Sequence, residues 1–159
     1  MIMRNCVVVP TFDEAENIDV VLEELLKIKD LDILVVDDGS PDGTGEMVEN
    51  WKAKSQGRVN LLSRKEKNGL GGAYQFGFAH CLKENYDVIC EMDADLSHDP
   101  AALPSLIKAV ESGKGDLAIG SRYVDGGQVP DWPLWRRFLS IGGNLYARLI
   151  LGLKVNDAT

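Results

Sequence analysis

Apolar runs and helical repeats alternate along the first 120 residues of the chain. Short and nearly continuous apolar runs predict buried strands over residues 5–10, 32–38, 58–63, 87–92 and 116–120. Between them, apolar residues recur at helical spacing and predict helices over about 14–29, 44–54, 72–84 and 100–112. This alternation predicts an α/β fold with a mostly parallel sheet and helices on both faces.

The pattern changes after residue 123. A loop rich in Gly and Pro covers 125–133, and an apolar stretch with the single charge Arg148 covers 138–153. This stretch is either a core helix with an oligomer contact or a segment at a membrane surface, and the sequence leaves both open. No run of 18 uncharged apolar residues occurs, so no membrane-spanning helix is predicted. At 159 residues we expect one domain.

Charged residues gather where the predicted strands end. Asp37 and Asp38 end the second strand, Arg64 follows the third, and Asp93 and Asp95 follow the fourth. In a parallel α/β sheet, ligands bind beyond the carboxyl ends of the strands. We therefore expect the functional site at this edge.

Asp93 and Asp95 are one residue apart and point the same way in an extended chain. Two like charges on one side repel unless a cation lies between them, and carboxylate oxygens suit Mg²⁺ or Mn²⁺. The alternative is a pair of solvated aspartates. The convergence of acids and bases on one edge favours a metal site for a phosphorylated ligand.

Two further segments carry candidate chemistry. Asp37 and Asp38 are acceptor-only groups that suit the hydrogen-bond donors of a nucleoside. The stretch 67–72 is either an anion site at a helix N-terminus or a flexible turn, and both interpretations stay open. Basic residues available for phosphates are Lys65, Lys67, Arg122, Arg136 and Arg137.

Composition narrows the class of protein. The chain has 17 basic and 25 acidic residues, a net charge of −8, which argues against a general nucleic-acid binder. Its three cysteines are an odd number without metal-site spacing, and no signal peptide is visible, so a reducing cytosol is expected.

Five segments together resemble a known family: VPTFDEAEN (9–17), VVDDGSPDGT (35–44), NGLGGA (68–73), MDADLSH (92–98) and GSRY (120–123). They resemble the inverting nucleotide-sugar transferases of glycosyltransferase family 2, and within it the dolichol- or polyprenol-phosphate mannose synthases. The resemblance implies a GT-A-type fold, GDP-mannose as donor, and a polyprenyl or dolichyl phosphate as acceptor. It also implies a cytoplasmic protein, peripheral at the membrane face, with an anchoring partner or a second copy as candidate contacts.

The resemblance also implies roles for residues. It places Pro10, Phe12, Glu14, Val36 and Asp38 around the nucleoside, Asp93 and Ala94 at the nucleotide, and Arg122 and Arg136 at phosphate. Asp95 would ligate Mg²⁺ or Mn²⁺ together with Asp93 and Ser97, and Asp95 and Arg122 would be catalytic. At position 97 this chain has serine, whereas glutamine is common in this branch. The family normally continues past Thr159, so we expect residues 1–159 to be a truncated catalytic domain. The alternatives are a UDP-sugar transferase and a non-catalytic subunit that binds a nucleotide sugar.

Overall fold

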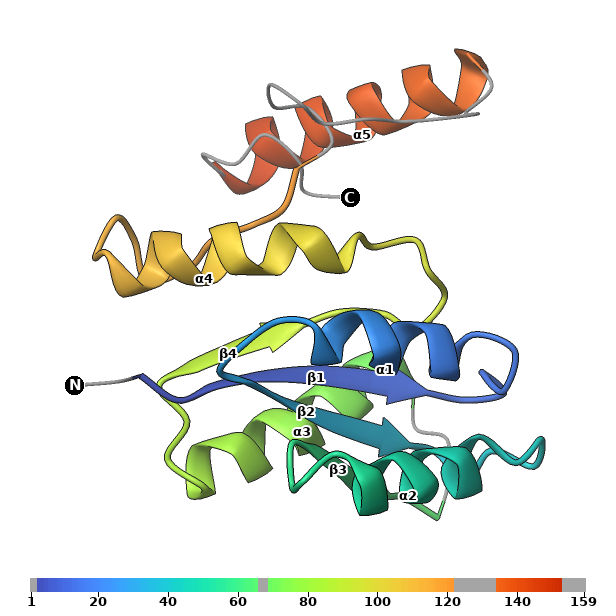
Figure 1. Ribbon diagram of the computed structural model, residues 1–159. Coiled ribbons are helices and arrows are strands. Elements are labelled where there is room, and N and C mark those ends of the chain that lie inside the picture. Colours follow the sequence, from blue (N-terminus) through green and yellow to red (C-terminus); the bar gives the residue numbers. More distant parts are fainter. Residues whose placement is uncertain (1–2, 66–68, 122–133, 153–159) are drawn as a thin grey trace. The chain divides into compact units, whose positions relative to one another are not determined.

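The structure is a computed structural model that describes residues 3–65, 69–121 and 134–152 (Figure 1). The chain divides into two compact units, Met1–Asp116 and Leu117–Thr159. The first unit holds the sheet, and the second holds α5 (Leu134–Leu151). The expectation of a single domain stays a prediction.

A parallel four-stranded sheet forms the centre of the first unit. Its order is β3-β2-β1-β4, and the strands are β1 (Asn5–Thr11), β2 (Leu31–Asp37), β3 (Val59–Ser63) and β4 (Val88–Glu91). β1 pairs with both β2 and β4, and all seven of its residues are buried. These strands confirm four of the five predicted ones and the parallel α/β class.

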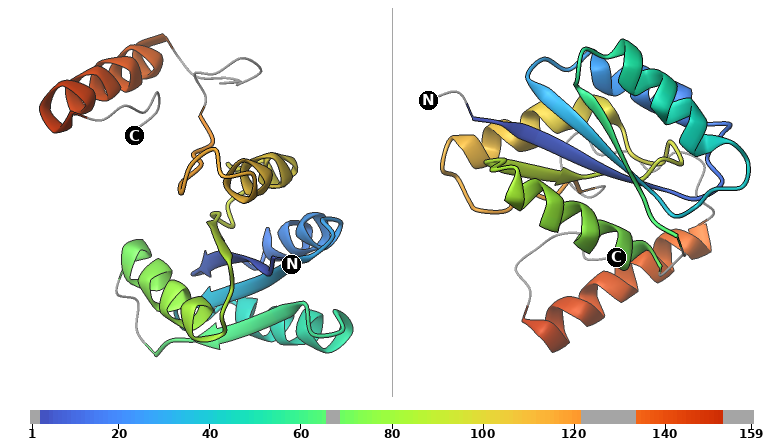
Figure 2. Two further views of the ribbon diagram at one scale, coloured as in Figure 1. Left: turned by 90° about the vertical axis from the view of Figure 1, so that its left-hand side faces the viewer. Right: turned by 90° about the horizontal axis from the view of Figure 1, so that it is seen from below.

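Helices cover both faces of the sheet, as Figure 2 shows. The helices are α1 (Ile18–Leu26), α2 (Thr44–Lys54), α3 (Leu70–Lys83) and α4 (Leu103–Glu111), with a short 3₁₀ turn at Pro100–Ala102 before α4. Alternate residues of a strand point to opposite faces. Val7 and Val9 accordingly pack in one core with residues of α1, α2 and α4, whereas Cys6 and Val8 pack with residues of α3.

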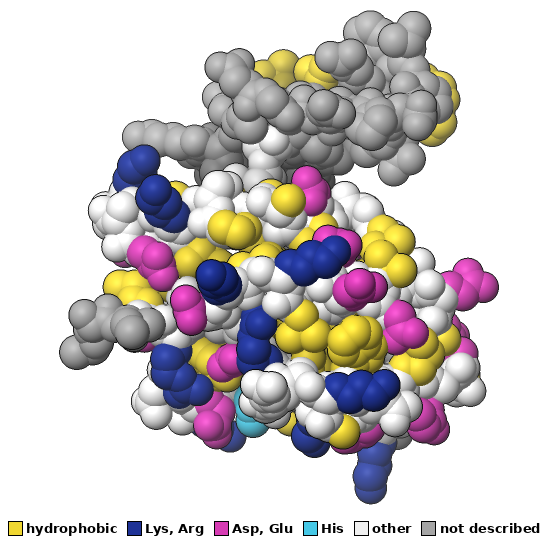
Figure 3. Space-filling view, in the orientation of Figure 1, with side chains coloured by type: hydrophobic (Ala, Val, Ile, Leu, Met, Phe, Trp, Pro, Cys, Tyr) yellow, Lys and Arg dark blue, Asp and Glu magenta, His cyan; other side chains and the backbone are white. Residues whose placement is uncertain are grey.

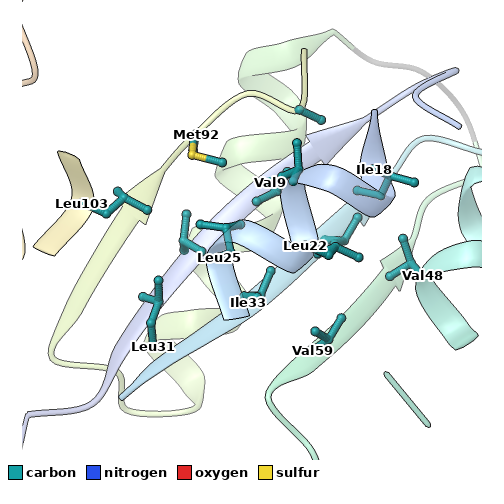
Figure 4. Close-up of a cluster of buried hydrophobic side chains, with 14 of the residues drawn as sticks. Val9, Ile18, Leu22, Leu25, Leu31, Ile33, Val48, Val59, Met92 and Leu103 are labelled. Atoms are coloured by element: carbon teal, nitrogen blue, oxygen red, sulfur yellow. The ribbon is translucent and has the colours of Figure 1, made fainter. Parts of the chain in front are cut away.

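The larger core joins the sheet to α1, α2 and α4 (Figure 4). Ile18, Leu22 and Leu25 of α1 are fully buried in it at the helical spacing that the sequence shows. Met92, directly after β4, is 2% exposed and belongs to the same cluster. The start of the loop after β4 is therefore fixed by the core.

On the opposite face, α3 lies unusually close to β1 at Gly77. A Cβ atom at this position would overlap Val8 Cγ1 and would lie 3.2 Å from Val36 Cγ2. Val8 and Val36 are both fully buried in central strands. Glycine at 77 therefore sets the distance between α3 and the sheet.

Two sequence predictions of elements need correction. The predicted strand over 116–120 is wrong, since the described chain forms no strand there, and Leu117 and Ile119 are 77% and 48% exposed. An apolar run makes a strand only when its backbone groups find a partner. Helix α1 begins at Ile18 rather than near Glu14, because a turn precedes it in which the Glu14 carbonyl accepts from Asn17 N at 3.0 Å.

The apolar stretch near the C-terminus lies largely in helix α5. Several of its apolar side chains are exposed, among them Trp135 at 64% and Leu149 at 75%. None of the helices that the structure describes is long and apolar enough to cross a membrane.

Candidate active site at the carboxyl ends of the strands

The loops after the four strands leave the sheet from one edge. Thr11 of β1 pairs with Asp37 of β2, which pairs with Ser63 of β3, so these three strands end side by side. On the other side of β1, Met92 N donates to the Val8 carbonyl at 3.2 Å. Met92 comes directly before Asp93 and Asp95, which we call the D-x-D pair. The predicted convergence of charged residues is therefore present in the first unit.

Asp37 organises the start of the loop after β2. Its Oδ1 accepts from Thr11 Oγ1 at 2.9 Å and from Ser40 Oγ at 2.5 Å. Its Oδ2 accepts from Gly39 N at 3.1 Å and Ser40 N at 3.0 Å. Four donors use the full acceptor capacity of a carboxylate. Asp37, which is 3% exposed, is thus a structural residue of the loop.

Asp38 is paired differently, with a basic residue from the next strand end. Arg64 Nε lies 3.3 Å from Asp38 Oδ1, and the two side chains are 11% and 5% exposed. Oδ1 of Asp38 and Nη1 of Arg64 are buried without a hydrogen-bond partner among the described residues. Burying a charge is costly unless an opposite charge lies nearby, and Arg64 supplies that charge for Asp38. The sequence places Arg64 at this edge but does not reveal the pair.

Three successive amides tie the loop after β1 to the loop after β2. Asp13 N donates to Ser40 Oγ at 3.0 Å, and Glu14 N donates to Thr44 Oγ1 at 3.0 Å. Ala15 N donates to Asp42 Oδ2 at 2.9 Å. The Thr44 hydroxyl and the Ala15 amide hold the pKa of Asp42 below its usual range. These bonds join the loop after β1, which contains Phe12 and Glu14, to the loop after β2, which contains Asp38. Together the two loops form one wall of the candidate site.

The D-x-D loop, which comprises residues 92–98, begins with residues that are alternately buried and accessible. Met92 and Ala94 are each 2% exposed and lie in the core, whereas Asp93 is half-buried and Asp95 is exposed. The two carboxylates therefore lie on the side away from the core, in agreement with the spacing argument. Leu96 has φ +61°, a backbone conformation rare for a leucine, and turns the chain directly after Asp95.

Asp93 is held at both its side chain and its backbone. Tyr74 Oη of α3 donates to Asp93 Oδ1 at 2.7 Å, and Asp93 N donates to His98 Nδ1 at 3.1 Å. Burial, followed by the hydrogen bond to Asp93, raises the pKa of Tyr74, so its phenol stays a donor at neutral pH. His98 thus closes the loop backward onto Asp93, and Asp99 caps the following turn by accepting from Ala101 N at 2.9 Å.

Asp95 is held only through its own loop in the described part of the chain. Ser97 N donates to Asp95 Oδ1 at 2.9 Å. The Ser97 hydroxyl, the largest influence, lowers the pKa of Asp95 below its usual range. Asp95 is therefore an ionised, exposed carboxylate at neutral pH, and Ser97 lies beside it. The metal-ligand roles assigned to the two residues stay predictions.

Other predicted nucleoside residues fall into two groups. Pro10, Val36 and Ala94 are buried, so a ligand would meet their backbone rather than their side chains. Phe12 and Glu14 are half-buried, and Glu14 Oε2 accepts from Asn17 Nδ2 at 2.9 Å. Arg122 and the side chain of Arg136 lie outside the described residues, as do Lys67 and the side chain of Arg137. The phosphate contacts assigned to them stay predictions.

The residues of the D-x-D loop fit a hard divalent cation by their chemistry. Within residues 3–65, 69–121 and 134–152, no group of three or more His, Cys, Asp or Glu side chains forms a ready metal centre. Mg²⁺ commonly takes only one or two carboxylates from the protein, and waters and phosphate oxygens of the substrate complete its shell. Asp93, Asp95 and Ser97 offer such an incomplete set of oxygen ligands.

A cavity of about 540 Å³ opens on the β3 side of the same edge. Asp37, Glu46 and Glu49 are among the residues that line it, whereas no residue of 92–98 does. An acidic lining repels a diphosphate. The candidate site is therefore assigned to the D-x-D loop and the wall beside it rather than to this cavity. On the face of the molecule drawn in Figure 3, described Lys and Arg side chains are interspersed with Asp and Glu.

Comparisons with known proteins place this geometry in a family. The model of glycosyl transferase family 2 matches residues 6–159. An undecaprenyl-phosphate mannosyltransferase from Micrococcus luteus is 46% identical over 99% of this chain and 64% of its own length. A polyprenol monophosphomannose synthase from Mycolicibacterium smegmatis is 46% identical over 98% of this chain and 59% of its own. The chain thus spans less than two thirds of the length of these two curated relatives.

A solved structure agrees with the fold. The mannosyltransferase PcManGT from Pyrobaculum calidifontis, in complex with GDP-Man and Mn²⁺, is 26% identical. It superposes with a TM-score of 0.59 over 67% of this chain and 32% of its own. The GT-A-type fold and the resemblance to polyprenol-phosphate mannose synthases are confirmed. With its parallel sheet, its D-x-D loop and a family match over nearly all its residues, the chain belongs to glycosyl transferase family 2.

Proposed function

We propose that the protein transfers mannose from GDP-mannose to a polyprenyl or dolichyl phosphate, with inversion at the sugar and with the help of Mg²⁺ or Mn²⁺. One observation carries the proposal: an exposed Asp95 and an oriented Asp93 stand at the sheet edge that also holds Asp38. The names of the two bacterial relatives and the ligands of the archaeal structure support the choice of donor and acceptor.

The proposal divides the site into a nucleoside part and a phosphate part. Asp38 accepts hydrogen bonds from the donor groups of the nucleoside, because an ionised carboxylate is an acceptor only. Phe12 and Glu14 stand on the wall that the amides of 13–15 tie to residues 40–44. Asp93 contacts the nucleotide beside the backbone of Ala94. Arg122 and Arg136 are proposed for the phosphates on sequence grounds alone.

Asp95, together with Asp93 and Ser97, would hold the divalent cation. The cation supplies positive charge that offsets the negative charge of the leaving diphosphate. An oxygen of the acceptor phosphate attacks the anomeric carbon, the bond from that carbon to the diphosphate oxygen breaks, and the configuration inverts. A phosphate monoester is largely ionised near neutral pH, so the chain needs no strong general base for this step.

A lipid-linked acceptor places the reaction at a membrane surface, and we propose a peripheral position at the cytoplasmic face. The exposed apolar residues of α5, such as Trp135, Leu139 and Leu149, support this position, because amphipathic helices bind the interface by such side chains. An anchoring partner or a second copy of the chain is the other occupant proposed for these side chains.

The test is calorimetric titration with GDP-mannose, UDP-glucose and UDP-N-acetylglucosamine, with and without Mn²⁺. It uses the longest natural form of the protein. We expect Mn²⁺-dependent binding with preference for GDP-mannose, followed by mannosyl transfer to a polyprenyl phosphate. Preference for a UDP-sugar would keep the fold and discard the donor. Binding without turnover in any acceptor assay would favour a non-catalytic subunit.

A substitution isolates the role of Asp95. Asp95→Ala should abolish the Mn²⁺-dependent part of donor binding, because it removes the exposed carboxylate. It should leave the fold intact, since the side chain is solvated. Donor binding with undiminished Mn²⁺ dependence in this variant would remove Asp95 from the metal site.

A further inference from the structure

Tyr74 reaches the D-x-D loop from the helix on the opposite face to the larger core. It lies in the second turn of α3, and its hydroxyl donates to Asp93 Oδ1 at 2.7 Å. Its ring is half-buried and packs near Phe78, with ring centroids 5.9 Å apart. Packing of the Tyr74 ring therefore fixes the position of the hydroxyl that donates to Asp93.

The two acids of the D-x-D pair differ in how firmly they are held. Asp93 has the phenol on its side chain and His98 Nδ1 on its amide, and its neighbours Met92 and Ala94 are buried. Asp95 is exposed, and in the described part of the chain its carboxylate accepts a hydrogen bond from Ser97, two residues away in the same loop. Of the two acids, Asp93 is therefore the one that a side chain connects to another element of the fold within the described residues.

We propose that Tyr74 is a positioning residue for donor binding: by occupying Oδ1 of Asp93 it leaves that carboxylate one orientation, in which Oδ2 is the oxygen offered to the nucleotide and its metal. This inference rests on the proposed function. Two carboxylates one residue apart repel each other, and a fixed Asp93 cannot turn away from Asp95 before the ligand arrives. The ordering cost is thus met during folding rather than during binding.

The expected effect is large enough to measure. Tyr74→Phe keeps the ring and removes only the hydroxyl. It should weaken Mn²⁺-dependent donor binding about tenfold, the order expected for losing one hydrogen bond to a charged group. The measurement is the Kd of the preferred nucleotide sugar by calorimetry, on the same long form of the protein.

The chain offers a matched control in Tyr86. Its hydroxyl donates to Asp32 Oδ2 at 2.8 Å, and Asp32 lies at the start of β2, at the edge opposite the site. Tyr86→Phe therefore removes a similar Tyr–Asp bond far from the D-x-D loop. We expect both variants to fold and to lose similar stability in urea, while only Tyr74→Phe loses donor affinity.

A double-mutant cycle separates positioning from a merely structural role. If Tyr74 acts through Asp93, then Tyr74→Phe should weaken binding little further in an Asp93→Asn background. If it acts through the general stability of the loop, the two losses should add. Additive losses would overturn the proposal.

The remaining outcomes are equally decisive. Wild-type affinity in Tyr74→Phe, an equal loss in Tyr86→Phe, or a Tyr74→Phe chain that does not fold would each overturn the positioning role and leave the proposed function standing. Failure of the wild-type protein to bind any nucleotide sugar would refute the proposed function and the role of Tyr74 together. Binding of a UDP-sugar would refute only the donor, and Tyr74 would then be tested with that sugar.

Discussion

Replacing Gly77 by alanine tests how α3 is seated on the sheet. The added methyl would overlap Val8 Cγ1 and would lie 3.2 Å from Val36 Cγ2 and 3.3 Å from Val8 Cγ2. Both valines are stiff, β-branched and fully buried in central strands, so neither can move aside cheaply. Overpacking of this kind costs about 3 kcal/mol, and the better helix propensity of alanine returns about 1 kcal/mol. We expect a net loss of about 2 kcal/mol.

The assay is urea unfolding followed by circular dichroism, with Gly71→Ala as the matched control. Gly71 lies in the same helix, and nothing lies within 4 Å of the position of its added Cβ. The control should therefore gain up to about 1 kcal/mol from propensity alone. For a chain of this size, the Gly77→Ala loss corresponds to a Tm about 4–8 °C lower. Equal stabilisation by both substitutions would refute the close-approach argument.

A second measurement tests which contact is responsible. Val8→Ala removes two of the three methyl groups that an alanine at position 77 would meet, including the one it would overlap, so the double variant should be more stable than the sum of the single losses predicts. Residues 74 and 77 share a face of α3. If Gly77→Ala moves the helix outward, it should also weaken donor binding by separating Tyr74 from Asp93.

Two further predictions concern the loop after β2. Asp37→Asn replaces an oxygen that accepts two hydrogen bonds by a donor, and should lower the free energy of unfolding by about 2–3 kcal/mol; unchanged urea midpoints would contradict its structural role. The pKa of Asp42 is lower in the folded chain than in the unfolded chain, so its contribution is present above about pH 4 and is lost as the pH falls through the folded value. Asp42→Asn should therefore lose less stability than wild type as the pH is lowered from neutral into the acid range, measured by urea midpoints, and parallel losses would argue against this linkage.

Much of the fold followed from local patterns. The central strands β1 and β2 are buried on both faces and therefore appear in the sequence as nearly continuous apolar runs. The outer strands β3 and β4 are only partly buried, but their short apolar runs still mark them in the sequence. The segment 116–120 has a similar composition but no strand partner in the described chain, and composition cannot show a partner. The start of α1 cannot be located from the sequence, because Glu14 to Asn17 form a turn whose residues also suit a helix.

The candidate site followed from the sequence only as far as one loop at a time. The spacing of Asp93 and Asp95 predicts that they share a side, and their burial pattern agrees. Nothing local marks Tyr74, which lies 19 residues before Asp93 in a different element, or the pairing of Arg64 with Asp38. Such contacts depend on how helices and strands pack, which periodicity does not encode.

The strand order β3-β2-β1-β4 also decides when each half of the site is complete during synthesis. β1 and β2 are joined by α1, so both strands, and residues 13–15 and 40–44 that bond to each other, are synthesised early and can pair before the rest of the sheet exists. The other edge of β1 waits for β4, about 80 residues later, which takes about 4–16 s at typical rates of translation. During that interval the Val7-Val8-Val9 edge is an open template for other strands. Nascent chains of this protein should therefore depend on chaperones until Val88–Glu91 emerges.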